Sequence, residues 1–367
     1  MKLIWNGPLL DPSGYGYCSR EYVQSLIKNE HTLYLDPVRY FIGDPKLYLN
    51  DATFNMIGDH LIPDNLITKD WTHIEHKTPG VLTSKKCKLN IGYTVWETDR
   101  MPHGFANTAN EKDMIWTASE FSKQSILNSG VHKPVKVIPH IIPTNKFVSN
   151  GERGKTLVFL FNGEFTYRKG VDVLLKAFMY AFQNHEDVLL ILKTYILDNF
   201  NYQTKYIEAK IGEWQKELDI QNRPKIKIIN QFIRDDELPK LYNIAHVFVT
   251  ATRGEGFGLP IAEAMSSRLL TIAPSIGGHR DFCTPDNCFL IDSEIVDIPD
   301  SMLEPGRQIY RGQKWVEPSF SHLVYLLRGC YDSYDFQIEK RQMARETILN
   351  HCNENKIVSL MEESIDA

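Results

Sequence analysis

The sequence predicts an α/β protein built from two doubly wound units. Short apolar, β-branched runs alternate with amphipathic helical patterns in both halves of the chain, and such alternation is typical of parallel sheets covered by helices. The length of 367 residues exceeds what one ordinary core supports and fits two domains of roughly 150–200 residues each. Glycine-rich turns follow strands in both halves, where open α/β sheets bind their ligands.

The first half opens with a strand, a glycine turn and a helix. The strand is expected at residues 2–5 and the amphipathic helix around residues 22–27. Gly14 and Gly16 lie in the turn between them, the layout of a first βα unit that faces a phosphate. A simple turn is the alternative interpretation.

The rest of the first half continues the alternation. Strands are expected at residues 89–97, 114–119 and 135–140, and Ser119 is placed to cap a helix over residues 120–127. The polar, glycine-rich segment at residues 150–154 then has the composition of a linker. We therefore place the domain boundary near residues 143–154.

The second half repeats the pattern. Strands are expected at residues 156–162, 188–193, 226–229, 244–250 and 269–274. Helices are expected at residues 171–182, 206–218 and 236–243, after residue 258, and from about residue 319 onward.

Composition narrows the class of protein. The chain is 43% hydrophobic and 24% charged, with a net charge of −5, which argues against a broad nucleic-acid surface. Its apolar runs fall short of the ~20 residues that span a membrane, and its N-terminal segment lacks the pattern of a signal peptide. Six scattered cysteines, with no second pair beside Cys283 and Cys288 at zinc spacing, indicate reduced thiols. We expect a cytoplasmic protein.

Residues 253–263, R-G-E-G-F-G-L-P-I-A-E, are the most informative run in the chain. A buried strand, a glycine loop and a helix that starts near Pro260 form an anion site, since unpaired N–H groups and the helix dipole favour negative charge. Glu255 and Glu263 would repel the anion itself and suit the hydroxyl groups beside it. Solvated glutamates in an ordinary turn are the alternative, but Glu263 occupies a helix position that is normally apolar. The run therefore predicts a site for a nucleotide-sugar.

This run resembles the E-x7-E signature of the retaining glycosyltransferases of family 4. The resemblance implies the GT-B fold: two Rossmann-like doubly wound domains that face a central cleft, with a C-terminal helix crossing back to the first domain. We therefore expect an acceptor-binding domain at residues 1–145, a nucleotide-sugar-binding domain at residues 155–335, and helices at residues 336–367 that pack back toward the first domain.

The same resemblance assigns catalytic residues. Glu255 corresponds to the glutamate that meets the donor sugar, and Glu263 to the one that meets the ribose. Lys169 matches the lysine of the family's G-R-x-x-x-x-K-G loop, whereas the arginine of that loop is replaced by Glu164. Arg168 then becomes the second cation for the diphosphate; a solvated charge pair is the alternative.

Other positions carry weaker assignments. The resemblance implies that Gly14 and Gly16 face the donor phosphate and that the segment at Phe232 and Ile233 holds the base. Lys193, at a strand end, is a further candidate for phosphate or ribose. The remaining candidates are the donor-loop residues Gly254, Gly256, Phe257, Gly258 and Leu259, with Tyr15 and Glu97 for the acceptor or donor sugar.

Glu97 stands where many family members have a histidine that contacts the donor sugar. It either binds sugar hydroxyls or is a structural carboxylate.

The resulting expectation is a retaining, metal-independent hexosyltransferase without a cofactor. Its donor would be a UDP- or GDP-linked sugar. Its acceptor would be a glycan, a lipid-linked sugar, a protein or a modified nucleic acid, with a peripheral membrane contact possible for the lipid case. A nucleotide-sugar epimerase or hydrolase of the same fold, or transfer onto a modified nucleobase in DNA, remains open at this point.

Overall fold

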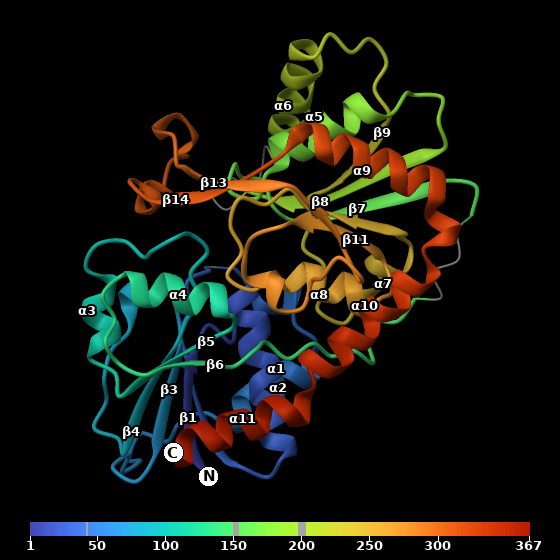
Figure 1. Cartoon of the computed structure of the whole chain (residues 1–367). Coiled ribbons are helices and arrows are strands. Elements are labelled where there is room, and N and C mark those ends of the chain that lie inside the picture. The colour runs from blue at the N-terminus through green and yellow to red at the C-terminus, as the bar shows by residue number, and fades with distance from the viewer. Residues whose placement is uncertain (42, 150–153, 197–202) are drawn as a thin grey trace. The chain divides into compact units, whose positions relative to one another are not determined.

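The computed structural model describes residues 1–41, 43–149, 154–196 and 203–367, and the chain forms two compact units (Figure 1). The first unit comprises Met1–Pro143, Phe232–Leu238 and His351–Ala367, and the second comprises Thr144–Gln231 and Pro239–Asn350. Most of the predicted linker, residues 150–153, lies outside the described residues.

The first unit is built on a six-stranded parallel sheet with the order β2-β1-β3-β4-β5-β6. Its strands are β1 (Lys2–Gly7), β2 (Thr32–Pro37), β3 (Thr72–His76), β4 (Leu89–Tyr93), β5 (Met114–Thr117) and β6 (Val135–Val137). Its helices are α1 (Gly14–Lys28), α2 (Asp51–Asp59), α3 (Phe105–Asn110), α4 (Glu120–Asn128) and α11 (Glu354–Asp366). The predicted cap of α4 is confirmed, because the Ser119 side chain accepts a hydrogen bond from the Ser122 N–H.

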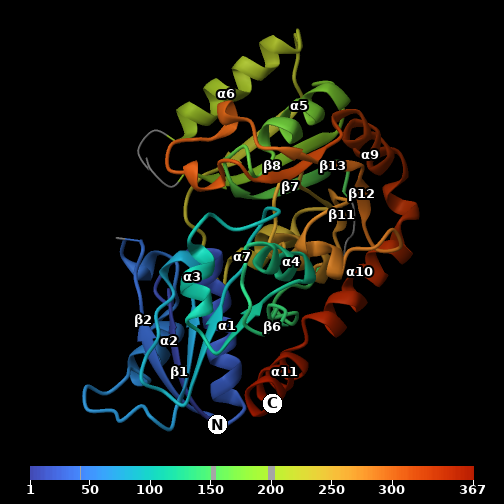
Figure 2. The same ribbon diagram turned by 60° about the vertical axis from the view of Figure 1, so that its left-hand side comes forward.

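The last helix of the chain belongs to the first unit. Helix α11 packs beside α1 (Figure 2), and Trp116 Nε1 on β5 donates a 2.9 Å hydrogen bond to Ser364 Oγ. The preceding helix α10 (Ile338–His351) instead lies almost wholly in the second unit, where Thr347 Oγ1 accepts a hydrogen bond from Asn287. The return to the first unit thus begins at His351, later in the chain than residue 336.

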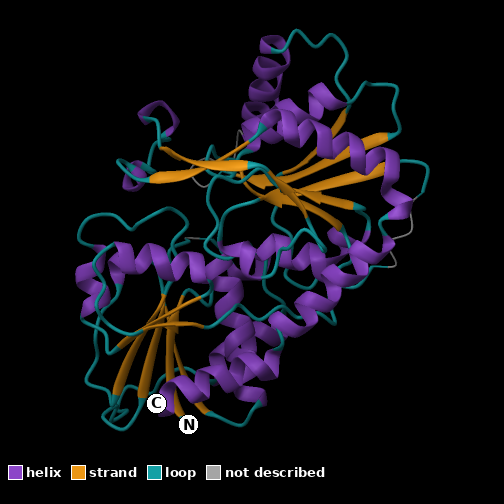
Figure 3. Cartoon of the chain, viewed as in Figure 1, coloured by secondary structure: helices purple, strands orange, loops and turns teal. Residues whose placement is uncertain are grey.

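The second unit repeats the architecture of a sheet with helices packed around it (Figure 3). Its parallel strands have the order β12-β11-β10-β7-β8-β9. Its strands are β7 (Leu157–Glu164), β8 (Val188–Tyr195), β9 (Lys225–Ile229), β10 (Val247–Val249), β11 (Leu270–Pro274) and β12 (Phe289–Ile291). Its other helices are α5 (Val171–Ala181), α6 (Gln203–Glu217), α7 (Leu238–Asn243), α8 (Leu259–Ser266) and α9 (Phe320–Ser333). The predicted fold class, two doubly wound α/β domains, is confirmed.

Several elements were not predicted from the sequence, namely β2, β3, β12, α2, α3, β13 (Ser293–Asp297) and β14 (Lys314–Pro318). Strands β13 and β14 form an antiparallel hairpin apart from the parallel sheet. The positions of β13 are half-buried or exposed and those of β14 are mostly buried, so neither strand shows the strict alternation that indicates a strand in a sequence.

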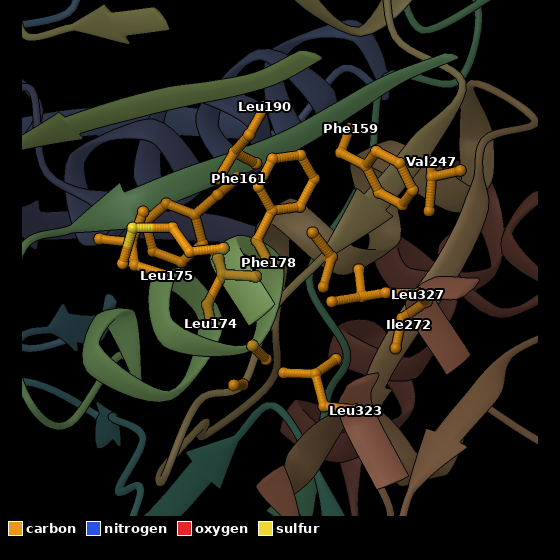
Figure 4. Close-up of a cluster of buried hydrophobic side chains, with 14 of the residues drawn as sticks. Phe159, Phe161, Leu174, Leu175, Phe178, Leu190, Val247, Ile272, Leu323 and Leu327 are labelled. Carbon is orange, nitrogen blue, oxygen red and sulfur yellow. The ribbon is translucent and has the colours of Figure 1, made fainter. Parts of the chain in front are cut away.

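One hydrophobic cluster of the second unit lies on one face of its sheet. Alternate residues of the strands, such as Phe159, Leu190 and Ile272, pack against Phe178 of α5 and Leu327 of α9 (Figure 4). All five side chains are completely buried, and burial of large apolar side chains is the main force that fixes sheet against helix. This packing holds the strands in position against α5 and α9.

Both sheets have a topological switch point, where consecutive connections leave in opposite directions. In the second unit, β7 pairs with β8 on one side and with β10 on the other, so the chain leaves β7 and β10 toward opposite edges of the sheet. In the first unit, β1 lies between β2 and β3 in the same way. Ligands of open α/β sheets bind at such points, outside the carboxyl ends of the strands.

Gly170 allows the loops after β7 and β10 to touch. Its φ is +65°, and a Cβ atom there would lie 1.8 Å from the carbonyl oxygen of Ala251. We expect Gly170→Ala to lower the free energy of unfolding by about 2–5 kcal/mol, because left-handed strain and overpacking against backbone add. Urea denaturation measures this.

Gly212→Ala is the matched control, because nothing lies within 4 Å of the added Cβ in α6. This change should stabilise the protein by about 0.5–1 kcal/mol through helix propensity. Equal stabilities of the two variants would contradict the close approach of the loops.

Candidate functional site

The candidate site of the second unit lies where the loops after β7 and β10 meet. Arg168 and Lys169 come from the first loop, and Gly254 and Glu255 come from the second. The backbone N–H of Arg253 donates a 2.6 Å hydrogen bond to the Arg168 carbonyl, and Arg168 Nη1 donates a 2.7 Å hydrogen bond to the Gly254 carbonyl. The structure thus brings together residues that are far apart in the sequence but were predicted to act together.

The buried side chain of Arg253 connects the elements that meet at this junction. Its guanidinium binds Asp172 at the start of α5 at 2.7 and 3.0 Å, and Glu317 of β14 at 2.7 and 2.9 Å. It also donates to the Tyr167 carbonyl at 2.7 Å. Burial opposes the charge of Arg253, but the two carboxylates outweigh it and raise the pKa of the guanidinium. Arg253 is 1% exposed, so its role is to fix the two loops and β14 together; the sequence analysis assigned it none.

Lys169 and Glu255 form an ion pair in the candidate site. Lys169 Nζ lies 2.6 Å from Glu255 Oε1, and their side chains are 16% and 11% exposed. Burial alone would raise the pKa of Glu255, but the charges of Lys169 and Arg168 lower it. Glu255 is therefore ionised at neutral pH, ready to accept hydrogen bonds from ligand hydroxyls.

Lys193 adds a buried cation at the end of the neighbouring strand β8. It pairs in register with Asn162 of β7 and is 8% exposed. Within the described part of the chain, no carboxylate forms an ion pair with it, and its ammonium group lies 5.8 Å from the centre of the Tyr195 ring. Burial lowers the pKa of Lys193 to about 8. A buried ammonium without a protein counter-ion favours an anionic ligand.

Glu263, on α8, is held by a chain of hydrogen bonds that the sequence analysis missed. Tyr242 donates a 2.5 Å hydrogen bond to Glu263 Oε2, and Asn162 Nδ2 donates to the Tyr242 hydroxyl at 3.1 Å. Burial, followed by the Glu263 charge, raises the pKa of Tyr242 well above its ordinary value, so the phenol remains the donor. A polar asparagine near the end of an apolar strand was the available sequence signal.

The residues of the predicted donor loop divide into two groups. Gly258 precedes α8 with a φ of +98°, and a Cβ there would lie 3.0 Å from the Cβ of His279, so this glycine is required by packing. Phe257 is 3% exposed and packs on Phe282 at 5.1 Å between ring centres. Gly254 and Gly256 flank Glu255 in the sequence, whereas Leu259 is the half-buried first residue of α8.

In the first unit, the predicted residues lie at the switch point of its own sheet. Gly14 is the first residue of α1 and has open space at its Cα, whereas a Cβ on Gly16 would lie 2.3 Å from the Asp11 carbonyl oxygen. Gly16 therefore has a packing reason to be glycine.

Tyr15 reaches the loop after β4, where its hydroxyl accepts a 3.1 Å hydrogen bond from the Val95 N–H and lies 3.3 Å from Thr94 Oγ1. Burial, and in smaller part the charge of nearby Glu97, raises the pKa of Tyr15. Glu97 itself is half-buried. The structure thus brings Tyr15 and Glu97 into one neighbourhood.

Phe232 and Ile233 follow β9 in the chain. They belong to the segment Phe232–Leu238, which is part of the first unit. The Phe232 ring contacts Phe41 at 5.5 Å and Tyr48 at 5.9 Å between ring centres. Their proposed contact with a base therefore remains a prediction.

The described part of the chain has neither a metal-binding cluster nor a helix that could span a membrane. Across residues 1–41, 43–149, 154–196 and 203–367, no group of three or more His, Cys, Asp and Glu side chains is arranged to hold a metal ion. In the same ranges, no helix combines the length and the apolar character needed to cross a membrane.

The second unit matches a known family. Residues 144–300 fit the model of the family described as Glycosyl transferases group 1. The matched region includes Arg168, Lys169, Lys193, Glu255 and Glu263. This region of the chain is thus similar to the glycosyl transferases of group 1.

Relatives in sequence are distant and partial. Mannosylfructose-phosphate synthase of Agrobacterium fabrum is 28% identical over 128 residues, which are 35% of this chain and 27% of that protein. One component of the phosphatidylinositol N-acetylglucosaminyltransferase of Arabidopsis thaliana is 23% identical over 230 residues, 58% of this chain and 48% of that protein. The matches thus span less than half the length of these two relatives.

The likeness to solved structures extends over the whole chain. HepE of Anabaena, solved in complex with UDP and glucose, has a TM-score of 0.70 at 15% identity and covers 100% of this chain and 99% of its own. At this identity the likeness shows the fold alone, which is the GT-B fold. The GT-B fold with two Rossmann-like domains is therefore confirmed, whereas the cleft that the resemblance implies between them stays a prediction.

Proposed function

We propose that the chain is a retaining, metal-independent glycosyltransferase of family 4, which moves a hexose or similar sugar from a nucleotide-sugar to an acceptor hydroxyl. The observation that carries the proposal is the ion pair between Lys169 and Glu255 at the switch point of a unit that is similar to the glycosyl transferases of group 1. A carboxylate that binds hydroxyls and a cation that binds phosphate are the two groups that a sugar diphosphate requires at its glycosidic bond.

Each side chain of the site has a proposed role. Lys169, Arg168 and Lys193 neutralise the diphosphate, whose charge grows as the glycosidic bond breaks. Glu255 accepts hydrogen bonds from the donor sugar, and Glu263, held by Tyr242, accepts them from the ribose. Glu255 and Glu263 together form the proposed E-x7-E pair.

The proposed reaction uses the donor's own phosphate as base. The bond between the anomeric carbon and the phosphate oxygen breaks while the acceptor oxygen attacks the same face of the sugar. The acceptor's proton passes to the leaving phosphate oxygen, so the products are a glycoside and a nucleoside diphosphate. Fixed cations, positioned before the reaction, supply the charge stabilisation that a metal ion would otherwise give.

The likeness to HepE, solved with UDP, favours a UDP-linked donor, with a GDP-linked donor as the other candidate. Glycans, lipid-linked sugars, proteins and modified nucleic acids are the acceptor classes to assay. We place the activity in the cytoplasm, since the spacing of the six cysteines in the sequence favours reduced thiols and thiols persist in reducing compartments.

Loss of either member of the central ion pair should abolish most of the transfer. We expect Glu255→Gln and Lys169→Ala each to lower kcat by about 10²–10³-fold, because each removes a preorganised charge from the reacting centre. The measurement is release of UDP or GDP from the nucleotide-sugar that gives the largest thermal shift. The anomeric configuration of the product, read by NMR, tests retention.

The matched controls are Glu213→Gln and Lys210→Ala, which remove the partners of an exposed ion pair on α6 and should leave kcat unchanged. EDTA should also leave it unchanged. Full activity of the Glu255 variant would overturn the site assignment, and loss of activity with EDTA would overturn metal independence.

The charge of Lys193 should make donor binding depend on pH. Its pKa is about 8, and a bound diphosphate favours the protonated form, so binding is strongest below this pKa and is lost as the pH rises through it. We expect the affinity for UDP to fall between about pH 7.5 and about pH 9.5, by at most tenfold per unit. Titration calorimetry at a series of pH values measures the fall.

Lys193→Arg keeps the cation at every pH in this range, so its UDP affinity should stay flat. Lys193→Met should bind UDP weakly and without this pH dependence. A flat profile for the wild-type protein, or the same fall in the arginine variant, would remove Lys193 from the donor site.

A further inference from the structure

The connection between β13 and β14, residues 298–313, lies against the loop that follows β7. Glu304 Oε1 accepts a 2.9 Å hydrogen bond from the Tyr167 N–H. The Arg307 guanidinium forms an ion pair with Glu164, the last residue of β7. A segment far along the chain thus delivers a cation to the end of the strand that carries the site.

A tight turn sets these two side chains in place. The backbone N–H of Arg307 donates a 2.9 Å hydrogen bond to the Glu304 carbonyl, and Gly306 between them has a φ of +78°, which glycine adopts without strain. Glu304 and Arg307 are therefore presented to the β7 loop by one fixed piece of backbone.

Arg307 differs from a structural arginine in how few of its donors are used. Arg253 directs hydrogen bonds to Asp172, Glu317 and the Tyr167 carbonyl and is 2% exposed in its side chain. The side chain of Arg307 is 25% exposed. Among the described residues, its guanidinium donates a hydrogen bond to Glu164. Since a guanidinium carries five N–H donors, Arg307 retains donors for a ligand.

The surroundings of Arg307 are those of the donor site. Burial first, and then the charge of Glu164, raises the pKa of Tyr195 to about 12, while Arg168 and Arg307 act in the opposite sense. The Tyr195 ring is also the one that the Lys193 ammonium approaches. Arg307 therefore lies in the same charged neighbourhood as Arg168 and Lys193.

We propose that Arg307 binds the diphosphate of the nucleotide-sugar, with Glu164 orienting its guanidinium. This inference rests on the proposed function and deepens it by naming a further donor-binding residue. Arg307 lies outside residues 144–300, the region that matches the family model. Position 164 carries a glutamate in place of the arginine of the family loop, and Arg307 in the hairpin connection supplies a cation there. A planar guanidinium can bind two phosphate oxygens at once, which suits it to this role.

The test compares the affinity for UDP and for GDP, by titration calorimetry, of the wild type, Arg307→Ala and Arg311→Ala. Arg311 is the matched control, because it lies in the same connection, pairs with Asp300 and is 63% exposed in its side chain. We expect Arg307→Ala to weaken binding of the better diphosphate by roughly 10–100-fold, as for the loss of charged hydrogen bonds, and Arg311→Ala to leave it unchanged.

A rescue variant separates ligand binding from a structural ion pair. Glu164→Arg combined with Arg307→Ala moves the guanidinium onto β7 and breaks the ion pair. We expect this double variant to bind the diphosphate within about threefold of wild type, a difference of about 0.7 kcal/mol. A purely structural ion pair would leave it as weak as Arg307→Ala.

Unfolding midpoints of all variants are measured alongside, and Arg307→Lys replaces Arg307→Ala if the latter does not fold; it keeps the charge and should lose several-fold in affinity. Wild-type protein that binds neither UDP nor GDP would contradict the proposed function. Wild-type binding that Arg307→Ala leaves intact, or that the double variant fails to recover, would overturn this inference and leave the proposed function standing.

Discussion

The buried guanidinium of Arg253 is the interaction on which the site depends. It joins the start of α5 through Asp172, the loop after β7 through Tyr167, and β14 through Glu317. These hydrogen bonds pair the charge of Arg253 in a buried position, where an unpaired charge would be strongly destabilising. Because Arg253 itself precedes Gly254 and Glu255 in the chain, fixing it also fixes the loop that carries the candidate catalytic carboxylate.

That rigidity explains how a small set of charges can serve a reaction. Lys169 and Glu255 already lie 2.6 Å apart, and Lys193 is buried on the adjacent strand. Charges that are positioned before a ligand arrives need little reorganisation in the transition state, which is the main source of electrostatic catalysis. The Glu304 and Arg307 turn extends the same arrangement from the hairpin side.

The sequence predicted what is encoded locally. Alternating strands and helices, the Ser119 cap and the glycine loop around Glu255 all carry short-range signals, and the fold class followed from them. Ion pairs such as that of Arg307 with Glu164, 143 positions apart, depend on where a hairpin lies, which no local pattern records. Phe257 was assigned to the donor loop through the family resemblance; its ring packs on Phe282, and its contact with a ligand stays a prediction.

Hydrogen–deuterium exchange with and without UDP tests whether the nucleotide binds where the loops after β7 and β10 meet, because it locates the ligand without a mutation. We expect saturating UDP to slow amide exchange in residues 164–170 and 250–258, the two loops that meet at the switch point of the second unit. Binding of UDP with protection confined to other segments, or with no protection in these two loops, would contradict this placement.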